Sequence, residues 1–201
     1  MAVTHTIEVP TSAAEIPLHR YQAFAGLTDE ERMNFTKVFM VLTGCTEEVA
    51  DQIKAKDVER ALNALIAALK DNTADLLHHY THGRTTYGFE PQLDEITFGM
   101  MTDICTAFES PDTWHKALAI LYRPILRTTE HMGGLYAIEP HRADGEAYKQ
   151  RQANFKHAPT SVFLGVRAFF LNGSMDLKRF IRDSSAPHSE KPTTSNGKRP
   201  Q

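Results

Sequence analysis

Three histidines are the residues of this sequence whose spacing first suggests chemistry. His78, His79 and His82 lie close together, and residues four apart share a face when a segment is helical. Such a pair could bind zinc. However, the segment lacks the His-Glu-x-x-His order, and Gly83 would end the helix at once. We favour a hydrated cluster at a helix end, where the helix dipole stabilises protonated histidine. His115 is expected on the exposed side of its own helix.

Nucleophiles and phosphate-binding loops give no stronger signal. Cys45 and Cys105 form no Cys-x-x-Cys pair and are expected to be buried free thiols in apolar helical segments. The sequence has no Gly-x-Ser-x-Gly elbow and no Gly-x-x-x-x-Gly-Lys loop. It therefore predicts a protein that is not an enzyme, with no catalytic residue, cofactor or metal. A metal-dependent enzyme that uses the three neighbouring histidines is a less favoured alternative.

Composition indicates a globular protein of ordinary size. The chain has 201 residues, of which 41% are hydrophobic and 23% charged, and its formal net charge is -3. This balance predicts no general attraction to nucleic acid or to anionic membranes. The most apolar stretch, residues 162–171, is too short to span a bilayer. We expect no signal peptide and a soluble protein made in the cytoplasm.

Apolar spacing predicts a mainly helical first half, with antiparallel helices over residues 17–70. Thr28 and Glu31 form a capping box, in which each side chain accepts a hydrogen bond from the other residue's backbone. The helix that this box opens is expected to bury Phe35 and to end at Gly44.

The second half combines helices with short strands. Further helices are predicted over residues 97–108, from Ser110 to Pro124, over 145–155, and from Pro159 to about Ile181. Trp114 and Tyr122 are expected on the buried face of the helix that Pro124 ends. Strands are predicted over residues 6–9, 84–89, 125–127 and 135–138, the last two joined as a hairpin near Gly133-Gly134.

These elements predict a mainly α (α+β) fold. A single domain is expected over residues 1–183, with the hairpin near 125–138. Residues 184–201 contain no large apolar side chain, so their burial cannot offset the entropy lost on ordering. We expect this segment to be a disordered tail.

Several segments resemble small proteins encoded among the structural genes of tailed bacteriophages. They are Ile7-Glu-Val-Pro-Thr11, Ile16-Pro-Leu-His-Arg-Tyr21, Leu42-Thr-Gly-Cys-Thr-Glu-Glu-Val49, Phe89-Glu-Pro-Gln-Leu-Asp-Glu-Ile-Thr-Phe-Gly99, the helix from Trp114 to Pro124, and Tyr136-Ala-Ile-Glu-Pro140. The chain departs from the pattern at Met100, where the similar proteins have Glu or Gln. Some proteins of this group are treated as tail assembly chaperones, which hold the tape-measure protein while the tail tube polymerises.

This resemblance implies a non-enzymatic assembly protein that binds a tape-measure or another tail or virion protein in the host cytoplasm. The alternative is a structural virion component, such as a head–tail connector or a packaged protein. Tyr122, Arg123 and Pro124 are the candidate site residues. Arg123 is either a structural clamp between a helix and the hairpin or a contact to another subunit. No nucleic-acid or membrane partner is expected, and homo-oligomerisation stays open.

Overall fold

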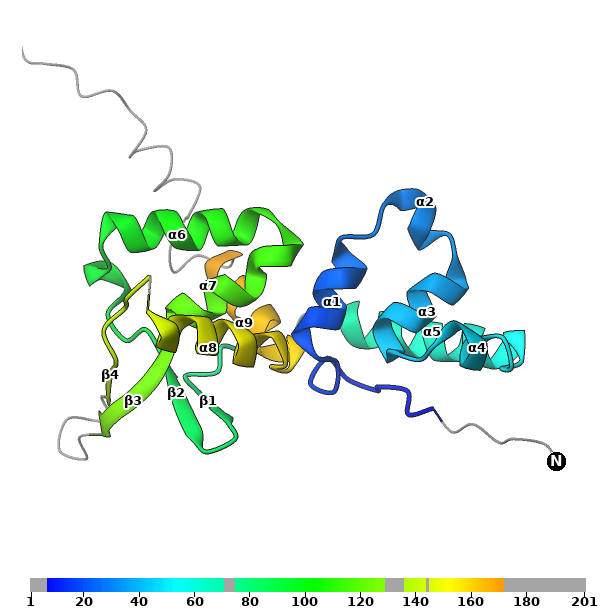
Figure 1. Cartoon of the computed structure of the whole chain (residues 1–201), viewed down its shortest axis with the longest axis horizontal. Helices are drawn as coiled ribbons and strands as arrows, with labels where there is room; N and C mark the ends of the chain where they lie inside the picture. Colours follow the sequence, from blue (N-terminus) through cyan, green and yellow to red (C-terminus); the bar gives the residue numbers. More distant parts are fainter. Residues whose placement is uncertain (1–6, 71–74, 129–135, 144, 172–201) are drawn as a thin grey trace, which may run out of the picture.

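The computed structural model describes residues 7–70, 75–128, 136–143 and 145–171, and these form two lobes (Figure 1). The N-terminal lobe is helical and contains α1 (Leu18–Ala25), α2 (Asp29–Arg32), α3 (Phe35–Thr43), α4 (Glu47–Ala50) and α5 (Ala55–Lys70). The C-terminal lobe contains β1 (His79–His82), β2 (Thr85–Phe89), η1 (Leu93–Glu95), α6 (Phe98–Glu109), η2 (Pro111–Thr113), α7 (Trp114–Leu121), β3 (Tyr122–Thr128), β4 (Tyr136–Ile138), α8 (Glu146–Lys156) and α9 (Thr160–Leu171). The predicted class, mainly α with a small antiparallel sheet, is confirmed.

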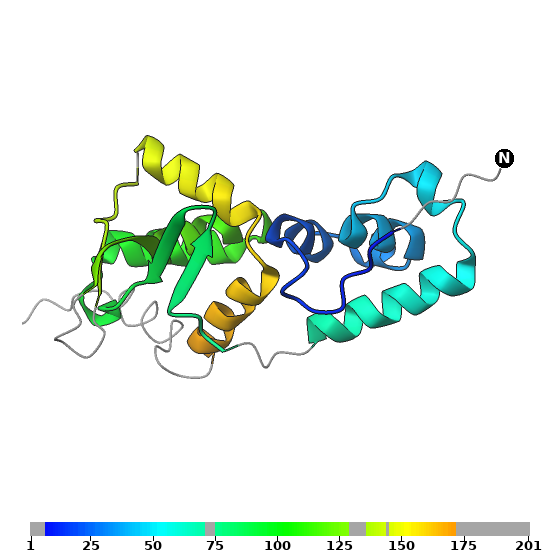
Figure 2. The ribbon, with the colours of Figure 1, turned by 90° about the horizontal axis from the view of Figure 1, so that it is seen from below.

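The lobes meet at the start of α1, which lies between them in both ribbon views (Figures 1 and 2). The backbone N–H of Leu18 donates to the carbonyl of Ala158 over 2.8 Å. Thr160 returns two bonds to the carbonyl of Ile16, from its N–H at 2.8 Å and its hydroxyl at 2.7 Å. Ile16, Leu18, Ala158 and Thr160 are all completely buried. This joint therefore ties the first helix to the turn between α8 and α9.

The capping box in the N-terminal lobe is confirmed, but the helix that it opens is short. Thr28 and Glu31 exchange both expected bonds, at 2.9 and 3.2 Å. The chain then leaves helical geometry, and Asn34 caps the separate helix α3 by accepting from the N–H of Lys37. The break turns Phe35 outward, 65% exposed, so its predicted burial is wrong. Gly44 ends α3 at φ 72°, a left-handed conformation that glycine adopts without strain.

Four antiparallel strands form one sheet in the order β1-β2-β3-β4. The predicted strand near residues 84–89 and the hairpin of β3 with β4 are confirmed, whereas β1 was not predicted. Tyr122 begins β3 instead of ending the preceding helix, so its helical assignment is wrong. Pro124 lies within β3 just before a register irregularity, the kind of position where a sheet tolerates a residue without an N–H.

Of the remaining secondary-structure predictions, some agree with the structure and others do not. Residues 7–10 have no regular secondary structure, so the described part of the predicted strand 6–9 is not a strand. The helices expected over 97–108 and 145–155 are present as α6 and α8, and α9 begins as predicted. Gly133-Gly134, the end of the last predicted helix and the predicted tail 184–201 lie outside the described residues.

Helix α7 forms the centre of the C-terminal lobe. All five of its residues from Ala117 to Leu121 are at most 1% exposed. It packs against α6 on one side and α8 on another, while α9 and the sheet complete the core (Figure 2). Tyr122, Phe155 and Phe163 are the largest of the fully buried side chains in this core, and burial of such aromatic groups is a major source of its stability.

Candidate functional site

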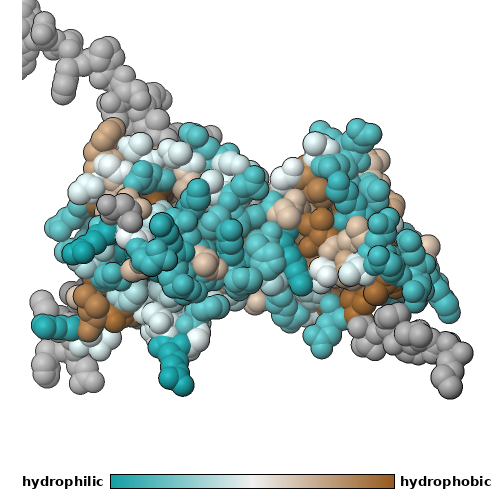
Figure 3. All heavy atoms as spheres, viewed as in Figure 1, coloured by the Kyte–Doolittle hydropathy of each residue, from teal (hydrophilic) through white to brown (hydrophobic). Residues whose placement is uncertain are grey.

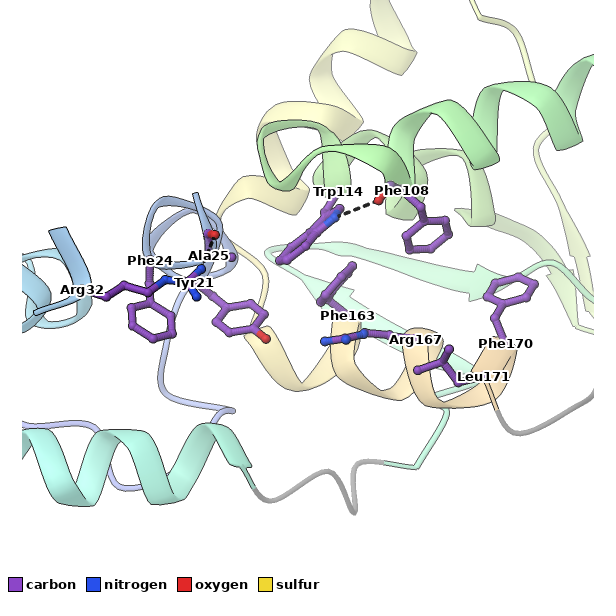
Figure 4. A pocket seen from close by; sticks show the side chains of 10 residues that line it. All are labelled: Tyr21, Phe24, Ala25, Arg32, Phe108, Trp114, Phe163, Arg167, Phe170 and Leu171. Atoms are coloured by element: carbon purple, nitrogen blue, oxygen red, sulfur yellow. Dashed lines mark hydrogen bonds between the residues drawn. The ribbon is translucent and has the colours of Figure 1, made fainter. Parts of the chain in front are cut away.

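A groove lined by aromatic side chains opens where the two lobes meet (Figure 4). Its volume is about 660 Å³. Its lining residues all come from helices: Tyr21, Phe24 and Ala25 of α1, Arg32 of α2, Phe108 of α6, Trp114 of α7, and Phe163, Arg167, Phe170 and Leu171 of α9. The groove thus joins five helices from three separate regions of the sequence.

Trp114 forms part of the groove wall and is only partly buried, so its predicted place in the core is wrong. Its indole ring stacks on Phe163 with ring centroids 4.4 Å apart and lies 5.6 Å from the ring of Tyr21. The indole N–H donates to the carbonyl of Phe108 at 3.3 Å. The physical reason is position, because Trp114 begins α7 and so lies at the edge of the core that the following turns fill. These contacts hold the ring in place while one side faces the groove.

The charged groups that line the groove are both cationic. Arg32 is exposed, and it donates to the carbonyl of Ala25 at 2.7 Å and lies 5.8 Å from the centre of the Phe24 ring. Arg167 is also exposed and extends from α9 toward Tyr21 (Figure 4). No carboxylate is among the described lining residues. The groove therefore combines an apolar floor with positive charge from two different helices.

A smaller hollow of about 260 Å³ continues from the groove onto the N-terminal lobe and shares Phe24 and Arg32 with it. Its remaining wall consists of Phe35, Val38, Glu59, Leu62, Asn63 and Ile66. Hydrophobic side chains are visible at the surface of this lobe in Figure 3, and Phe35 is 65% exposed. The apolar surface thus extends beyond one lobe.

A polar contact fixes the lobes beside the groove. The side-chain amide of Gln22 donates to the carbonyl of Pro111 and lies 3.1 Å from Nδ1 of His115. His115 is only 5% exposed, so its predicted exposed position is wrong. Loss of hydration, helped by the positive charges of Lys156 and Lys116 and opposed by Asp112, lowers the pKa of His115 to about 4. The imidazole is accordingly neutral at pH 7.

The predicted site residues Tyr122, Arg123 and Pro124 lie at the start of β3, and none of them lines the groove. The hydroxyl of Tyr122 donates to the carbonyl of Leu77 at 2.6 Å. Arg123 forms a buried ion pair with Glu90, and the two side chains are 7% and 9% exposed. The pair thus joins β3 to the residue that follows β2, and the two roles predicted for Arg123, a clamp between a helix and the hairpin or a subunit contact, stay predictions.

Charged groups around Arg123 include a second ion pair, between Arg151 and Glu139 at 3.0 Å. Burial, helped by the positive charge of Arg151 and opposed by Glu139, lowers the pKa of Arg123 to about 10. At that value Arg123 stays protonated at neutral pH and can hold Glu90. Sequence reasoning missed Glu90 as the partner because it lies 33 positions away, and only the pairing of β2 with β3 brings them together.

The three neighbouring histidines do not converge on a helix face, because His79 and His82 belong to strand β1. Residues three apart in a strand point to opposite sides of the sheet. The ring of His79 packs 4.7 Å from that of Tyr136, while Nδ1 of His82 lies 3.2 Å from the hydroxyl of Tyr80. Among the described residues, no group of three or more His, Cys, Asp or Glu side chains is arranged to hold a metal ion.

The two cysteines are less buried than expected. Both are free and only partly buried, and Cys45 follows α3 instead of lying within it. Its sulfur accepts from the hydroxyl of Thr43 at 3.3 Å. Burial raises the pKa of Cys105, and nearby Glu109 adds to the increase. A raised pKa means that less of the thiol is ionised, so Cys105 is a poorer nucleophile than a solvent-exposed cysteine of ordinary pKa.

No family model, curated protein or solved structure matches this chain. None of the helices in the described ranges is long and apolar enough to cross a membrane. The groove is the feature that best fits a binding role. Sequence reasoning missed it because Phe24, Phe108 and Phe170 read individually as ordinary members of apolar stripes. The one available signal was the placement of Arg167 inside the most apolar segment of the chain.

Proposed function

We propose that this protein is a non-enzymatic assembly protein of a tailed bacteriophage, a tail assembly chaperone that holds a helical segment of the tape-measure protein. Its site of action would be the host cytoplasm during tail assembly. The proposal draws on the resemblance of segments such as Phe89–Gly99 to phage structural-module proteins. It places no chemical step in the protein, which would act by covering apolar surface of its client.

The single observation that carries the binding role is the aromatic groove. Trp, Tyr and Arg are the residue types most enriched among those that dominate binding energy at protein interfaces. Tyr21, Trp114, Arg32 and Arg167 all line this groove, and the exposed Phe35 extends it. An apolar groove between helices is also the usual receptor for the apolar face of a client helix. This geometry supports a protein partner.

A co-expression experiment tests the proposal. The tape-measure protein encoded in the same genome should remain soluble and co-purify with this protein. Leu171→Glu places a charge in the groove at a side chain that is 70% exposed, so it should abolish co-purification without unfolding the chain. Leu126→Glu is the matched control, because Leu126 is 61% exposed on β3 and does not line the groove.

Two results would contradict the proposal. If the tape-measure protein is not bound, or if Leu171→Glu and Leu126→Glu behave alike, the groove is not the client site. Mass spectrometry of purified virions gives a second test, since a chaperone that acts only during assembly should be absent or present in traces. Many copies per virion would instead favour the structural-component alternative.

A further inference from the structure

We infer that the client segment is an acidic amphipathic helix, whose carboxylates pair with Arg32 and Arg167 while its apolar face fills the groove. This inference rests on the proposed function and adds the chemistry of the partner. The two common modes of peptide recognition require different surfaces: an extended peptide pairs with a free strand edge, whereas a helix lies in a cleft lined by apolar side chains. Every described lining residue belongs to a helix, so the groove offers no strand edge.

The charge of the groove predicts which charge the client helix carries. Arg32 and Arg167 reach the groove from α2 and α9, and no described lining side chain is acidic. A guanidinium carries five N–H donors in a planar fork. Arg32 uses one nitrogen for the carbonyl of Ala25, and its contact with the Phe24 ring keeps the group beside the apolar floor. Each arginine can therefore pair with a carboxylate on the flank of a bound helix.

The same arrangement predicts where the client's residues lie on its helix. Apolar side chains spaced three or four residues apart would pack against the partly exposed rings of Phe24, Trp114 and Phe170, which line the groove. Glu or Asp residues would border this stripe. A helix with basic residues on its flanks would instead meet like charge at both arginines.

Three synthetic peptides test this inference with the full-length protein. They share one apolar stripe, lack tryptophan, and differ only in whether the flanking residues are Glu, Gln or Lys. Trp114 is the chain's one tryptophan, so its fluorescence reports binding to the groove directly. The Glu peptide should bind about fivefold more tightly than the Gln peptide, the effect of one or two exposed ion pairs, and the Lys peptide should bind most weakly. High salt should remove most of this difference.

Substitution of the arginines supplies the decisive comparison. Arg167→Glu should abolish the preference between the Glu and Lys peptides, because it leaves one positive and one negative group at the groove, and Arg32→Gln should reduce it. Arg127→Glu is the control, since Arg127 is exposed on β3 away from the groove. Circular dichroism would verify that each variant is folded.

The outcomes separate this inference from the proposed function. Equal binding of the three peptides, or a preference unchanged by Arg167→Glu, would overturn the acidic-helix inference while leaving the chaperone proposal intact. Arg167-dependent binding of an oligonucleotide or of anionic vesicles, with no peptide bound, would also overturn it. So would competition by a peptide of residues 172–201, because the chain's own segment would then be the occupant.

Discussion

Removal of one partner from the Arg123–Glu90 ion pair should destabilise the protein strongly. The side chains are 7% and 9% exposed, so either substitution leaves an opposite charge buried without its counterion. Such a loss costs about 3–5 kcal/mol. A domain's free energy of unfolding is about 5–15 kcal/mol, so the loss is a large share of it. With a shift of about 2–4 °C per kcal/mol for a chain of this size, Tm should fall by roughly 6–20 °C.

The assay is urea unfolding followed by circular dichroism, applied to Arg123→Met, Glu90→Met and the double variant. Each single substitution should lower the unfolding free energy by the amount above. The double variant should be far more stable than the sum of the two losses predicts, because it leaves no unpaired buried charge. Arg60→Met is the surface control: Arg60 lies 3.4 Å from Asp57 with its side chain 77% exposed, and its loss should cost less than about 1 kcal/mol.

A loss of unfolding free energy in Arg123→Met no greater than that in Arg60→Met, or two single losses that simply add in the double variant, would contradict the buried ion pair as a source of stability. Size-exclusion chromatography would then decide whether Arg123 serves the other role considered for it. A folded Arg123→Met variant with an altered oligomeric state would identify a contact between subunits.

Three other perturbations have equally direct readouts. Gly165→Ala should lower the free energy of unfolding in urea by about 1–3 kcal/mol, because the new Cβ would overlap the carbonyl oxygen of Asp75. Gly99→Ala, whose Cβ would meet nothing closer than 3.9 Å, should not destabilise the protein. His115 stays neutral in the folded state down to about pH 4 but takes a proton near pH 6.5 when unfolded. Its contribution to the free energy of unfolding is therefore fully present above pH 6.5 and is lost as pH falls from 6.5 to 4. A stability profile that stays flat over this range, or that slopes equally in His115→Gln, would contradict this. Trp114→Ala should lower the unfolding free energy by less than the roughly 3–5 kcal/mol of a fully buried tryptophan, and it should remove peptide binding as measured by calorimetry. In the native protein, acrylamide should partly quench Trp114 fluorescence, and complete protection would place the ring in the core.

Local signals in the sequence determined most of the helix and strand boundaries. The capping box of Thr28 and Glu31, the left-handed Gly44 and the start of α9 after Pro159 each depend on neighbouring residues, whose effects act within one or two turns. The hairpin of β3 and β4 was recognisable for the same reason. Helix α3 departs from the prediction because the Asn34 cap competes with continuation from α2, and the sequence does not show which of two adjacent start signals dominates.

Tertiary structure alone decided the candidate site. Phe24, Phe108 and Phe163 are separated by tens of residues, and only the packing of α1, α6 and α9 around one opening places them together. Burial also depends on distant contacts: Trp114 begins α7 and lies at the edge of the core, whereas the next residue, His115, is buried beside Gln22 of α1. A sequence states which side chains are apolar, but which of them remain uncovered depends on the distant surfaces that the folded chain brings against them.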